Sequence, residues 1–387
     1  MYLTLNLKKT TVNRSDQSTY FGYTLRKQGS SFILRRKQRN QAAEWFKEWN
    51  ARALSAADGQ LHILEDGILS KKDLTILFEN EDMKQYFPVE SVSDINTYSD
   101  MIYSSGFFDL MNRKRITVHL FNKYGSSIGI FIPEQVTGNA SYLLKQAAVY
   151  NDTAARLKYA KAIELAIMKN IVAQLRYYRR HIENPEIKEA VEAIQELIKR
   201  IKKSSSVDEL LLLEARGRSQ YYRCIPAIIG KSEFSFMGRR RRPPGDEINA
   251  MMSFGNSFLY DRISSMISRS NLDNRISFLH SSLRRRNNLC LDLADIYKPF
   301  IVDSVIFTLV NKRMISPEDC FDYPEDGVYL NQKGIALFLK ELKDKLTSRI
   351  NSEGQMLSYF AIIRRDLQRL KKSLEENGDF APFVRNG

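Results

Sequence analysis

Several side chains in the second half of the chain are of the types that hold divalent metal ions. Glu214 follows a run of leucines in LLLLEARGRSQYY, and a carboxylate is costly to bury unless it is paired or binds a metal. His280 lies among apolar neighbours in SFLHSSL. Asp292 and Asp295 are three residues apart, so they share one face of the helix that their segment predicts. These residues are candidates for a metal site.

Each candidate also has an ordinary structural explanation when it is taken alone. The helix could turn Glu214 to solvent, His280 could be a hydrogen-bonded core residue, and the aspartates could be surface acids facing arginines. The chain has 4 histidines, none in an HxxxH or HxH pair, so a metal site must be rich in carboxylates. Such a site suits Mg²⁺ or Mn²⁺ better than zinc. The widely spaced cysteines are expected to be reduced, buried thiols, and they are Cys224, Cys290 and Cys320.

Two arginine runs lie near these candidates in the sequence. Together with the candidate ligands they indicate a phosphate channel over a metal, although each run alone is more often a solvated face. The whole chain has 59 Lys and Arg against 45 Asp and Glu, which favours a polyanionic partner such as nucleic acid. The runs are Arg239, Arg240, Arg241 and Arg242, and Arg284, Arg285 and Arg286.

The start of the chain and its hydropathy argue against a membrane protein. No stretch of about 18 uncharged apolar residues occurs, and MYLTLNLKKTTVNRS lacks the apolar core of a secretory signal. An anionic membrane surface would satisfy the basic charge equally well, but nothing else in the sequence favours it. We therefore expect a soluble protein of the cytoplasm.

The two halves of the chain differ in pattern, which predicts an α+β protein. Residues 57–135 contain short alternating runs broken by turn residues, so we expect a β-rich N-terminal domain that ends in a hairpin. Within it, YSDMIYSSGFFDLMN is expected to form one helix. Residues 136–150 are expected to be a linker, and residues 151–387 an all-helical catalytic domain.

Long helices should make up this second domain. Apolar positions recur every three or four residues over 157–178 and again over 187–201, which predicts an antiparallel helical hairpin. Its apolar stripe could be either a core face or a dimer seam. The tail, residues 331–377, is expected to contain two further amphipathic helices.

Local signals place the candidate residues on these elements. Ser206 and Glu209 have the spacing of a capping box, so Glu214 should lie inside the helix that begins there. Pro299 predicts a kink or a break soon after Asp295.

Three segments resemble the spacer-acquisition integrases of CRISPR systems. GRRRRPPGDEINAMMSFGNSFLY is similar to that family's arginine-rich PP-D-x-x-N-A signature with the following S-F-G. LLLLEARGRSQYY resembles the motif around its metal-binding glutamate, with Ala215 where the family commonly has glycine. FLHSSLRRRNNLCLDLADIYKPFIVD resembles the motif that holds the remaining ligands. The resemblance covers about residues 58–380.

The resemblance implies a function and a set of roles. Glu214, His280 and Asp295 would hold Mg²⁺ or Mn²⁺, with Asp292 beside them and Lys298 neutralising charge in the transition state. Asn249 and Tyr222 would orient phosphate, and the two arginine runs would contact the DNA backbone. The reaction would be attack of a DNA 3′-OH on a phosphodiester of a CRISPR array, or nicking when water attacks.

Partners follow from the same resemblance. It implies a homodimer built through the β-rich domain, double-stranded DNA as substrate, and a small ferredoxin-like subunit. Residues 1–56 have a weaker resemblance to the end of a reverse transcriptase palm, which predicts a remnant of a fused polymerase followed by a linker helix. The alternatives are a structure-specific nuclease acting on branched DNA and a non-catalytic DNA-binding scaffold.

Overall fold

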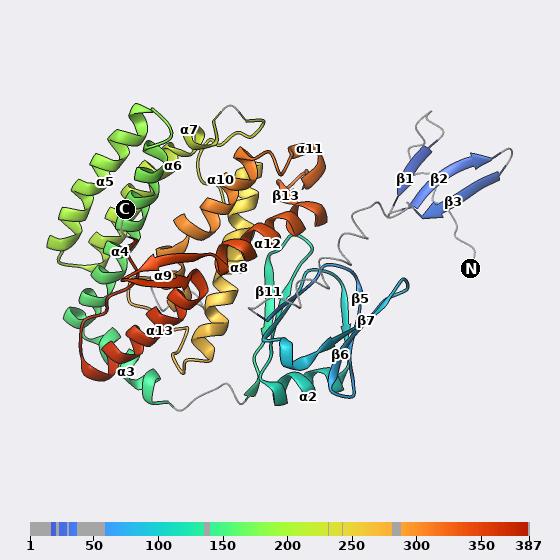
Figure 1. Cartoon of the computed structure of the whole chain (residues 1–387), viewed down its shortest axis with the longest axis horizontal. Coiled ribbons are helices and arrows are strands. Elements are labelled where there is room, and N and C mark those ends of the chain that lie inside the picture. Colours follow the sequence, from blue (N-terminus) through green and yellow to red (C-terminus); the bar gives the residue numbers. More distant parts are fainter. Residues whose placement is uncertain are drawn as a thin grey trace. The chain divides into compact units, whose positions relative to one another are not determined.

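The computed structural model describes residues 59–134, 140–230, 232–241, 243–280 and 288–385, and the backbone of three strands between residues 17 and 36. The chain forms two compact units, Met1–Trp49 and Asn50–Gly387. In the first unit the strands pair antiparallel in sequence order, and they are β1 Gln17–Tyr20, β2 Tyr23–Gln28 and β3 Ser31–Arg36 (Figure 1). The linker helix expected after the polymerase remnant lies outside the described residues.

A strand-rich segment begins the second unit, as its alternating pattern predicts. Its elements are β4 Gln60–Ile63, β5 Gly67–Lys72, β6 Thr75–Glu79, β7 Lys84–Pro88, β8 Asp94–Thr97, β9 Met101–Tyr103, α2 Ser105–Lys114, β10 Thr117–Phe121 and β11 Ser127–Phe131. They form two four-stranded sheets, of order β11-β10-β8-β4 and β7-β6-β5-β9. The predicted hairpin is the antiparallel pair β10–β11.

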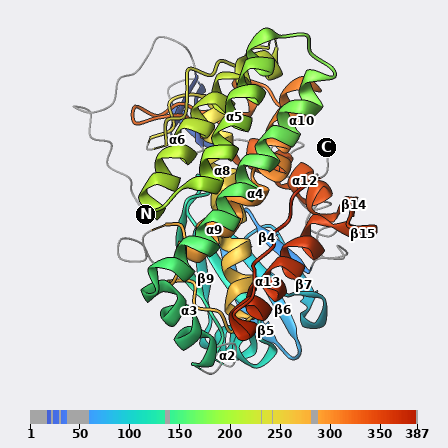
Figure 2. The same ribbon diagram turned by 90° about the vertical axis from the view of Figure 1, so that its left-hand side faces the viewer.

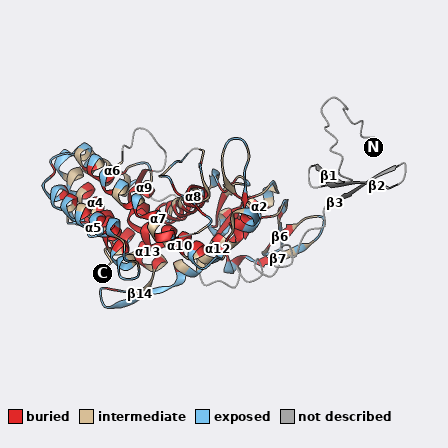
Figure 3. Cartoon of the chain, turned by 90° about the horizontal axis from the view of Figure 1, so that it is seen from above, coloured by how far each residue is buried: buried red, intermediate tan, exposed pale blue. Residues whose placement is uncertain are grey.

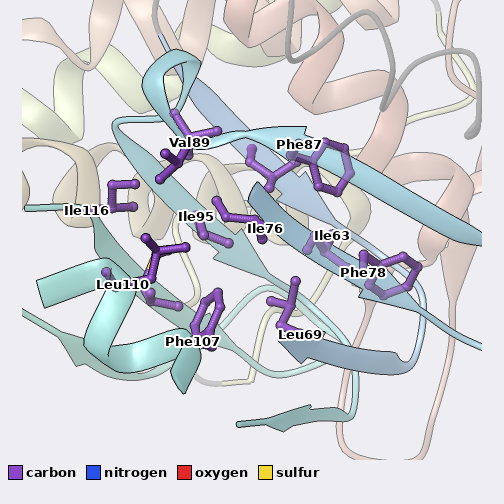
Figure 4. Close-up of a cluster of buried hydrophobic side chains, with 14 residues drawn as sticks. Ile63, Leu69, Ile76, Phe78, Phe87, Val89, Ile95, Phe107, Leu110 and Ile116 are labelled. Carbon is purple, nitrogen blue, oxygen red and sulfur yellow. The ribbon is translucent and has the colours of Figure 1, made fainter. Parts of the chain in front are cut away.

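The two sheets and α2 enclose one apolar core. Ile63, Leu69, Ile76, Phe87 and other buried side chains of the strands meet Phe107, Leu110 and Ile116 from α2 and the residues around it (Figure 4). All four residues of β4 and of β8 are buried, as expected for strands that are covered on both faces.

The single helix expected over residues 98–112 is wrong. Met101–Tyr103 forms strand β9, which pairs in parallel with β5, and the helix begins only at Ser105. The side chain of Ser104 accepts a hydrogen bond from the backbone N–H of Phe107 at 3.2 Å, so it is the N-cap that fixes this start. Pairing with β5 therefore overrides the local helical pattern.

Helices dominate the remainder of the second unit. Their bounds are α3 Ser141–Asn151, α4 Thr153–Arg179, α5 Pro185–Lys203, α6 Val207–Arg223, α7 Ile225–Ile229, α8 Glu247–Ser268, α9 Asn288–Tyr297, α10 Ser304–Asn311, α11 Pro317–Cys320, α12 Gln332–Thr347 and α13 Tyr359–Glu376. Short antiparallel hairpins join some of them, with strands β12 Phe321–Asp322, β13 Tyr329–Leu330, β14 Arg349–Ser352 and β15 Gln355–Ser358. Helix α3 lies in the segment that was expected to be a linker.

Helix α4 runs through the centre of the helical part. It packs against α5, α6 and α9, and Figure 2 shows α4, α5 and α6 side by side. The predicted stripe is buried within a single copy of the chain, because Ile163, Ile167, Ile171 and Leu175 have no exposed surface. Figure 3 shows buried residues in the interior of the helical part and exposed ones on its outside. The core-face explanation of this stripe is therefore confirmed.

Pro299 and the three cysteines agree with what the sequence predicts for them. Pro299 begins a π-helical segment, Pro299–Asp303, that joins α9 to α10, so the predicted irregularity is confirmed. The three cysteines are buried thiols, as expected. Among the described residues, no helix combines the length and the apolar character needed to cross a membrane.

A buried polar network joins the strand-rich segment to α8. Asp94 on β8 has no exposed surface, and its carboxylate lies 2.7 Å from Arg262 Nη1 and 2.8 Å from Arg269 Nη2. Ser265 and Gln60 donate further hydrogen bonds to it. Burial alone would raise the pKa of Asp94, but the arginine charges lower it well below its ordinary value. This network fixes α8 against the sheet.

A second buried aspartate on α8 is less well satisfied, which makes stability depend on pH. Asp261 accepts one hydrogen bond from Ser127 at 3.4 Å, its other oxygen has no partner among the described residues, and burial raises its pKa to about 6. The folded state therefore binds the proton more tightly, and stability falls as pH rises from about 4 to 6. We expect Asp261→Asn to raise the free energy of unfolding by about 2 kcal/mol at pH 8 and by little at pH 4, in urea titrations at both pH values.

Candidate metal centre

Helix α6 holds Glu214 in the interior. Ser206 is the N-cap, because its side chain accepts from the backbone N–H of Glu209 at 3.2 Å, and Glu209 in turn accepts from Ser205 N at 3.0 Å. The predicted capping box is thus confirmed at its first bond, while its return bond goes to the preceding residue. Glu214 lies two turns into the helix and is 7% exposed, so it is buried and not turned to solvent.

Asp292 positions the histidine. Its carboxylate accepts hydrogen bonds from the backbone N–H groups of Phe278, Leu279 and His280 at 2.7, 2.9 and 3.0 Å. It also lies 2.7 Å from Nδ1 of His280. Both oxygens are therefore engaged, and Nε2 of the imidazole is left to bind a ligand. Burial alone would lower the pKa of His280, but the hydrogen bond to Asp292 outweighs it and raises that pKa.

The three predicted ligands come together from distant parts of the sequence. Glu214 from α6, His280 from the segment before α9, and Asp295 from α9 each offer a ligand atom, and these atoms all lie within 4.8 Å of one another. Two buried carboxylates and one imidazole make a donor set that suits Mg²⁺ or Mn²⁺. The predicted Asp292–Asp295 face exists, but only Asp295 belongs to this cluster.

Two cations neutralise the cluster, and they are the buried Lys298 and the largely buried Arg218. Arg218 Nε donates to Glu214 Oε1 at 2.6 Å, and Arg218 Nη2 lies 2.7 Å from Asp295 Oδ2. A guanidinium thus bridges the same two carboxylates that would hold a metal, which supports the fit of a cation there. Lys298 pairs with the other oxygen of Asp295 and donates to the Tyr260 hydroxyl.

These charges perturb each other's protonation. Burial alone would raise the pKa of Asp295, but the nearby charges of Arg218 and Lys298 lower it far below its ordinary value. Burial alone would likewise lower the pKa of Lys298, and Asp295 raises it instead. Asp295 is therefore ionised and Lys298 is charged at neutral pH.

Sequence reasoning missed one carboxylate next to the site. Glu164 on α4 has no exposed surface, and neither of its oxygens has a hydrogen-bond partner among the described residues. Burial, and then the charge of Glu214, raise its pKa well above the ordinary value. The signal was present in AKAIELAIM, where a glutamate interrupts apolar residues just as Glu214 does.

The π-helical segment Pro299–Asp303 is hydrogen-bonded to α6, the helix that carries Glu214. Tyr221, one residue before the predicted Tyr222, donates to Asp303 Oδ2 at 2.9 Å. Burial raises the pKa of Asp303 to about 6. Asp303, whose pKa is raised, is thus the last residue of the π-helical segment. π-Helical turns often occur at functional sites.

The signature segment GRRRRPPGDEINA builds the start of α8 and fastens the arginine loop to it. Asp246 is the N-cap and accepts from the backbone N–H of Asn249 at 2.7 Å. The Asn249 side chain accepts from Arg239 Nη1 and Arg240 N, and donates to Gly238 O and Asp246. All its hydrogen-bonding capacity is used within the protein, so Asn249 fixes the shape of the loop.

The arginines of this loop differ in their availability. Arg239 donates to Asn249 and to Ser253 Oγ at 3.1 Å, so its guanidinium is held by the protein. Arg240 and Arg241 are exposed. Arg242 and the run Arg284, Arg285 and Arg286 lie outside the described residues.

Tyr222 lies on α6 and contacts the segment that leads into this loop. Its ring contacts Phe236 with centroids 6.2 Å apart, and its phenol is close enough to influence the pKa of both Arg218 and Arg239. Tyr222 is thus near both Arg218, which contacts the cluster, and Arg239, which begins the arginine run.

Comparison with known proteins gives consistent matches. The profile of the family described as "CRISPR associated protein Cas1" matches residues 61–344. A CRISPR-associated endonuclease Cas1 of Thermodesulfovibrio yellowstonii is 37% identical over 326 residues, covering 84% of this chain and 98% of that protein. The structure of a CAS1 protein from Thermotoga maritima is 31% identical with a TM-score of 0.75, covering 84% of this chain and 100% of that one.

More distant solved structures share the fold. A Cas6-RT-Cas1–Cas2 complex is 14% identical with a TM-score of 0.74, and the alignment covers 95% of this chain and 46% of that chain. A casposase bound to its integration product is 19% identical with a TM-score of 0.72. The family match over most of the sequence, and the close relatives aligned along nearly their full length, show that this chain belongs to the Cas1 family of CRISPR-associated proteins.

Proposed function

We propose that this chain is a metal-dependent DNA endonuclease and integrase that inserts new spacers into a CRISPR array. The observation that carries the proposal is the buried cluster of Glu214, His280 and Asp295, whose ligand atoms lie within 4.8 Å of one another. The names of its Cas1 relatives, which are called endonucleases, agree with it. A Mg²⁺ or Mn²⁺ ion bound there would polarise a phosphodiester and stabilise the charge that develops on its oxygens.

The side chains around the cluster have distinct tasks in this reaction. Asp292 keeps the imidazole of His280 in one orientation and leaves Nε2 available. Lys298, held by Asp295 and Tyr260, supplies a fixed positive charge next to the reacting phosphate. The 3′ oxygen of the incoming strand bonds to phosphorus as the array's bridging 3′ oxygen leaves, and when water attacks the product is a nick.

The proposal is tested by joining a labelled DNA fragment to a supercoiled plasmid that carries a CRISPR array. We expect joining with Mn²⁺, none with EDTA, and none with His280→Ala, in reactions that contain the small partner subunit. The same His280→Ala protein should still bind DNA in a gel-shift assay. Binding without joining or nicking by the wild-type protein would contradict the proposal and favour the DNA-binding scaffold.

Exposed arginines of the signature loop are proposed to contact the DNA backbone. Arg240 and Arg241 are exposed, whereas Arg239 is held by Asn249 and Ser253. We expect the double substitution Arg240→Ala and Arg241→Ala to weaken binding of every DNA sequence equally and to reduce the slope of log K against log salt by about 2. Titrations at several salt concentrations measure this slope, and an unchanged slope would contradict the assignment.

Apolar side chains on the strand-rich segment support the proposed homodimer. Ile68 on β5 and Ile102 on β9 are register partners, and both are exposed, at 41% and 66%. Ile128 and Ile130 on the edge strand β11 are also exposed. Large exposed apolar groups of this kind are typical of protein interfaces. Light scattering that gave only a 44.9 kDa species would contradict the dimer.

Two further associations are part of the proposal. The solved complexes that share this fold contain Cas2, which supports assembly with a small ferredoxin-like subunit of that kind. The fold alignment with the chain that includes a reverse transcriptase covers 95% of this sequence, against 84% for the Thermotoga maritima protein. That difference supports residues 1–56 as the remnant of a fused polymerase, and co-purification with a separately expressed polymerase domain tests the association.

A further inference from the structure

The metal centre contains one acid to which the proposed reaction gives no task. Glu164 is completely buried, and both of its oxygens lack a hydrogen-bond partner among the described residues. A buried carboxylate without a partner is destabilising, so its presence beside Glu214 needs an explanation.

Arg218 already contacts the carboxylate oxygens that a metal ion would need. Its guanidinium bridges Glu214 Oε1 and Asp295 Oδ2 at 2.6 and 2.7 Å, and these two residues are proposed metal ligands. A divalent ion held by these carboxylates would lie within a few ångströms of the guanidinium, and the two like charges would repel strongly in a buried site. The guanidinium and the ion therefore compete for the same oxygens.

Moving Arg218 away creates a need for a new anionic partner. The residue is largely buried, with its side chain 14% exposed, so a guanidinium that left both carboxylates would be a buried charge without a partner. Asp292 cannot receive it, because both of its oxygens are bound to the segment that carries His280. Glu164 has two acceptor oxygens without partners.

Close packing of the two helices brings these residues together. Helices α4 and α6 are in contact, and Gly217, next to Arg218, is packed so tightly that an added Cβ would lie 2.4 Å from Met168 Sδ of α4. Arg218 is also near enough to lower the pKa of Glu164, against the larger opposing effects of burial and Glu214. A rotation of the long Arg218 side chain can therefore transfer its guanidinium toward α4.

We propose that Glu164 is a positioning residue that accepts the guanidinium of Arg218 when a divalent ion takes Glu214 and Asp295. This inference rests on the metal site of the proposed function. In the metal-free protein Arg218 neutralises the two ligands, and on metal binding it exchanges them for Glu164. The exchange gives the Arg218 guanidinium a carboxylate partner in both states, and it preserves the arrangement of the ligands before the ion arrives.

Metal affinity of the full chain, measured without DNA, tests the exchange. Isothermal titration with Mn²⁺ should show Glu164→Gln raising the Kd by about 10- to 100-fold, the effect typical of losing a group that supports the metal ligands. In an Arg218→Met background, which removes the competing guanidinium, Glu164→Gln should have no further effect. Gln174→Leu changes another buried polar residue of α4 and should leave the Kd unchanged.

The remaining outcomes overturn the inference in distinguishable ways. Equal weakening by Glu164→Gln in both backgrounds would make Glu164 a direct metal ligand. A lowered Tm with an unchanged Kd, or an equal effect of Gln174→Leu, would make its role merely structural. A wild-type chain that binds no Mn²⁺ would instead refute the metal site of the proposed function itself. Arg218→Gln serves as a second background if Arg218→Met is unstable.

Discussion

Glu214→Gln is expected to reduce Mn²⁺-dependent DNA nicking and joining by at least about a thousandfold, the scale on which losing one essential catalytic group acts. The amide has the size of the carboxylate but no charge, so it is a poor ligand for a hard divalent ion. Glu214 is 7% exposed and is one of the two carboxylates in the ligand cluster, so its loss leaves that cluster with one carboxylate. Single-turnover rates on a labelled substrate, with enzyme in excess, measure the loss directly.

A matched variant on the same helix separates a metal role from a general loss of fold. Asp208→Asn removes an exposed carboxylate from the first turn of α6 and should retain the wild-type rate. Glu214→Gln should keep the DNA affinity and the circular dichroism spectrum of the wild type, because Arg218 retains Asp295 as a partner. A Glu214→Gln protein that nicked DNA at more than about a tenth of the wild-type rate would refute the ligand assignment.

The sequence predicted which three residues meet in the cluster because each of them breaks an apolar pattern. A carboxylate after four leucines, a histidine in SFLHSSL and two acids on one helical face are all costly unless they serve a purpose. Resemblance to the integrase motifs then selected Asp295 over Asp292 as the ligand, and the cluster contains Asp295 alone. Glu164 breaks its apolar pattern in the same way, but the stripe predicted on α4 was defined by apolar residues alone and so did not include it.

Features that depend on contacts between distant segments could not be predicted in this way. Strand β9 forms because β5 offers it a parallel partner, and no local pattern in Met101–Tyr103 shows that partner. Asn249 was expected to orient phosphate, and the hydrogen bonds by which it holds Arg239 and Arg240 in the loop were not predicted. The fold class followed from periodicity alone, whereas the pairing of β9 and the hydrogen bonds of Asn249 depend on contacts with distant or looping segments.

Asp292→Ala is expected to cause a large loss of stability, lowering the free energy of unfolding by about 3–5 kcal/mol. The carboxylate has no exposed surface and satisfies the backbone N–H groups of Phe278, Leu279 and His280 together with the His280 imidazole. Alanine leaves these buried donors without an acceptor, and each unsatisfied donor costs about 1–3 kcal/mol before the structure relaxes.

Equilibrium unfolding in urea measures this loss, and Asp322→Ala, which removes an exposed aspartate, is the control that should change stability by less than about 0.5 kcal/mol. Asp292→Asn should fall between the two, because one amide oxygen can still accept from the backbone but its NH₂ group cannot. A loss below about 1 kcal/mol for Asp292→Ala would mean that water replaces the carboxylate. The segment before α9 would then hold His280 without help from α9, and the geometry of the metal ligands would have to come from the ion itself.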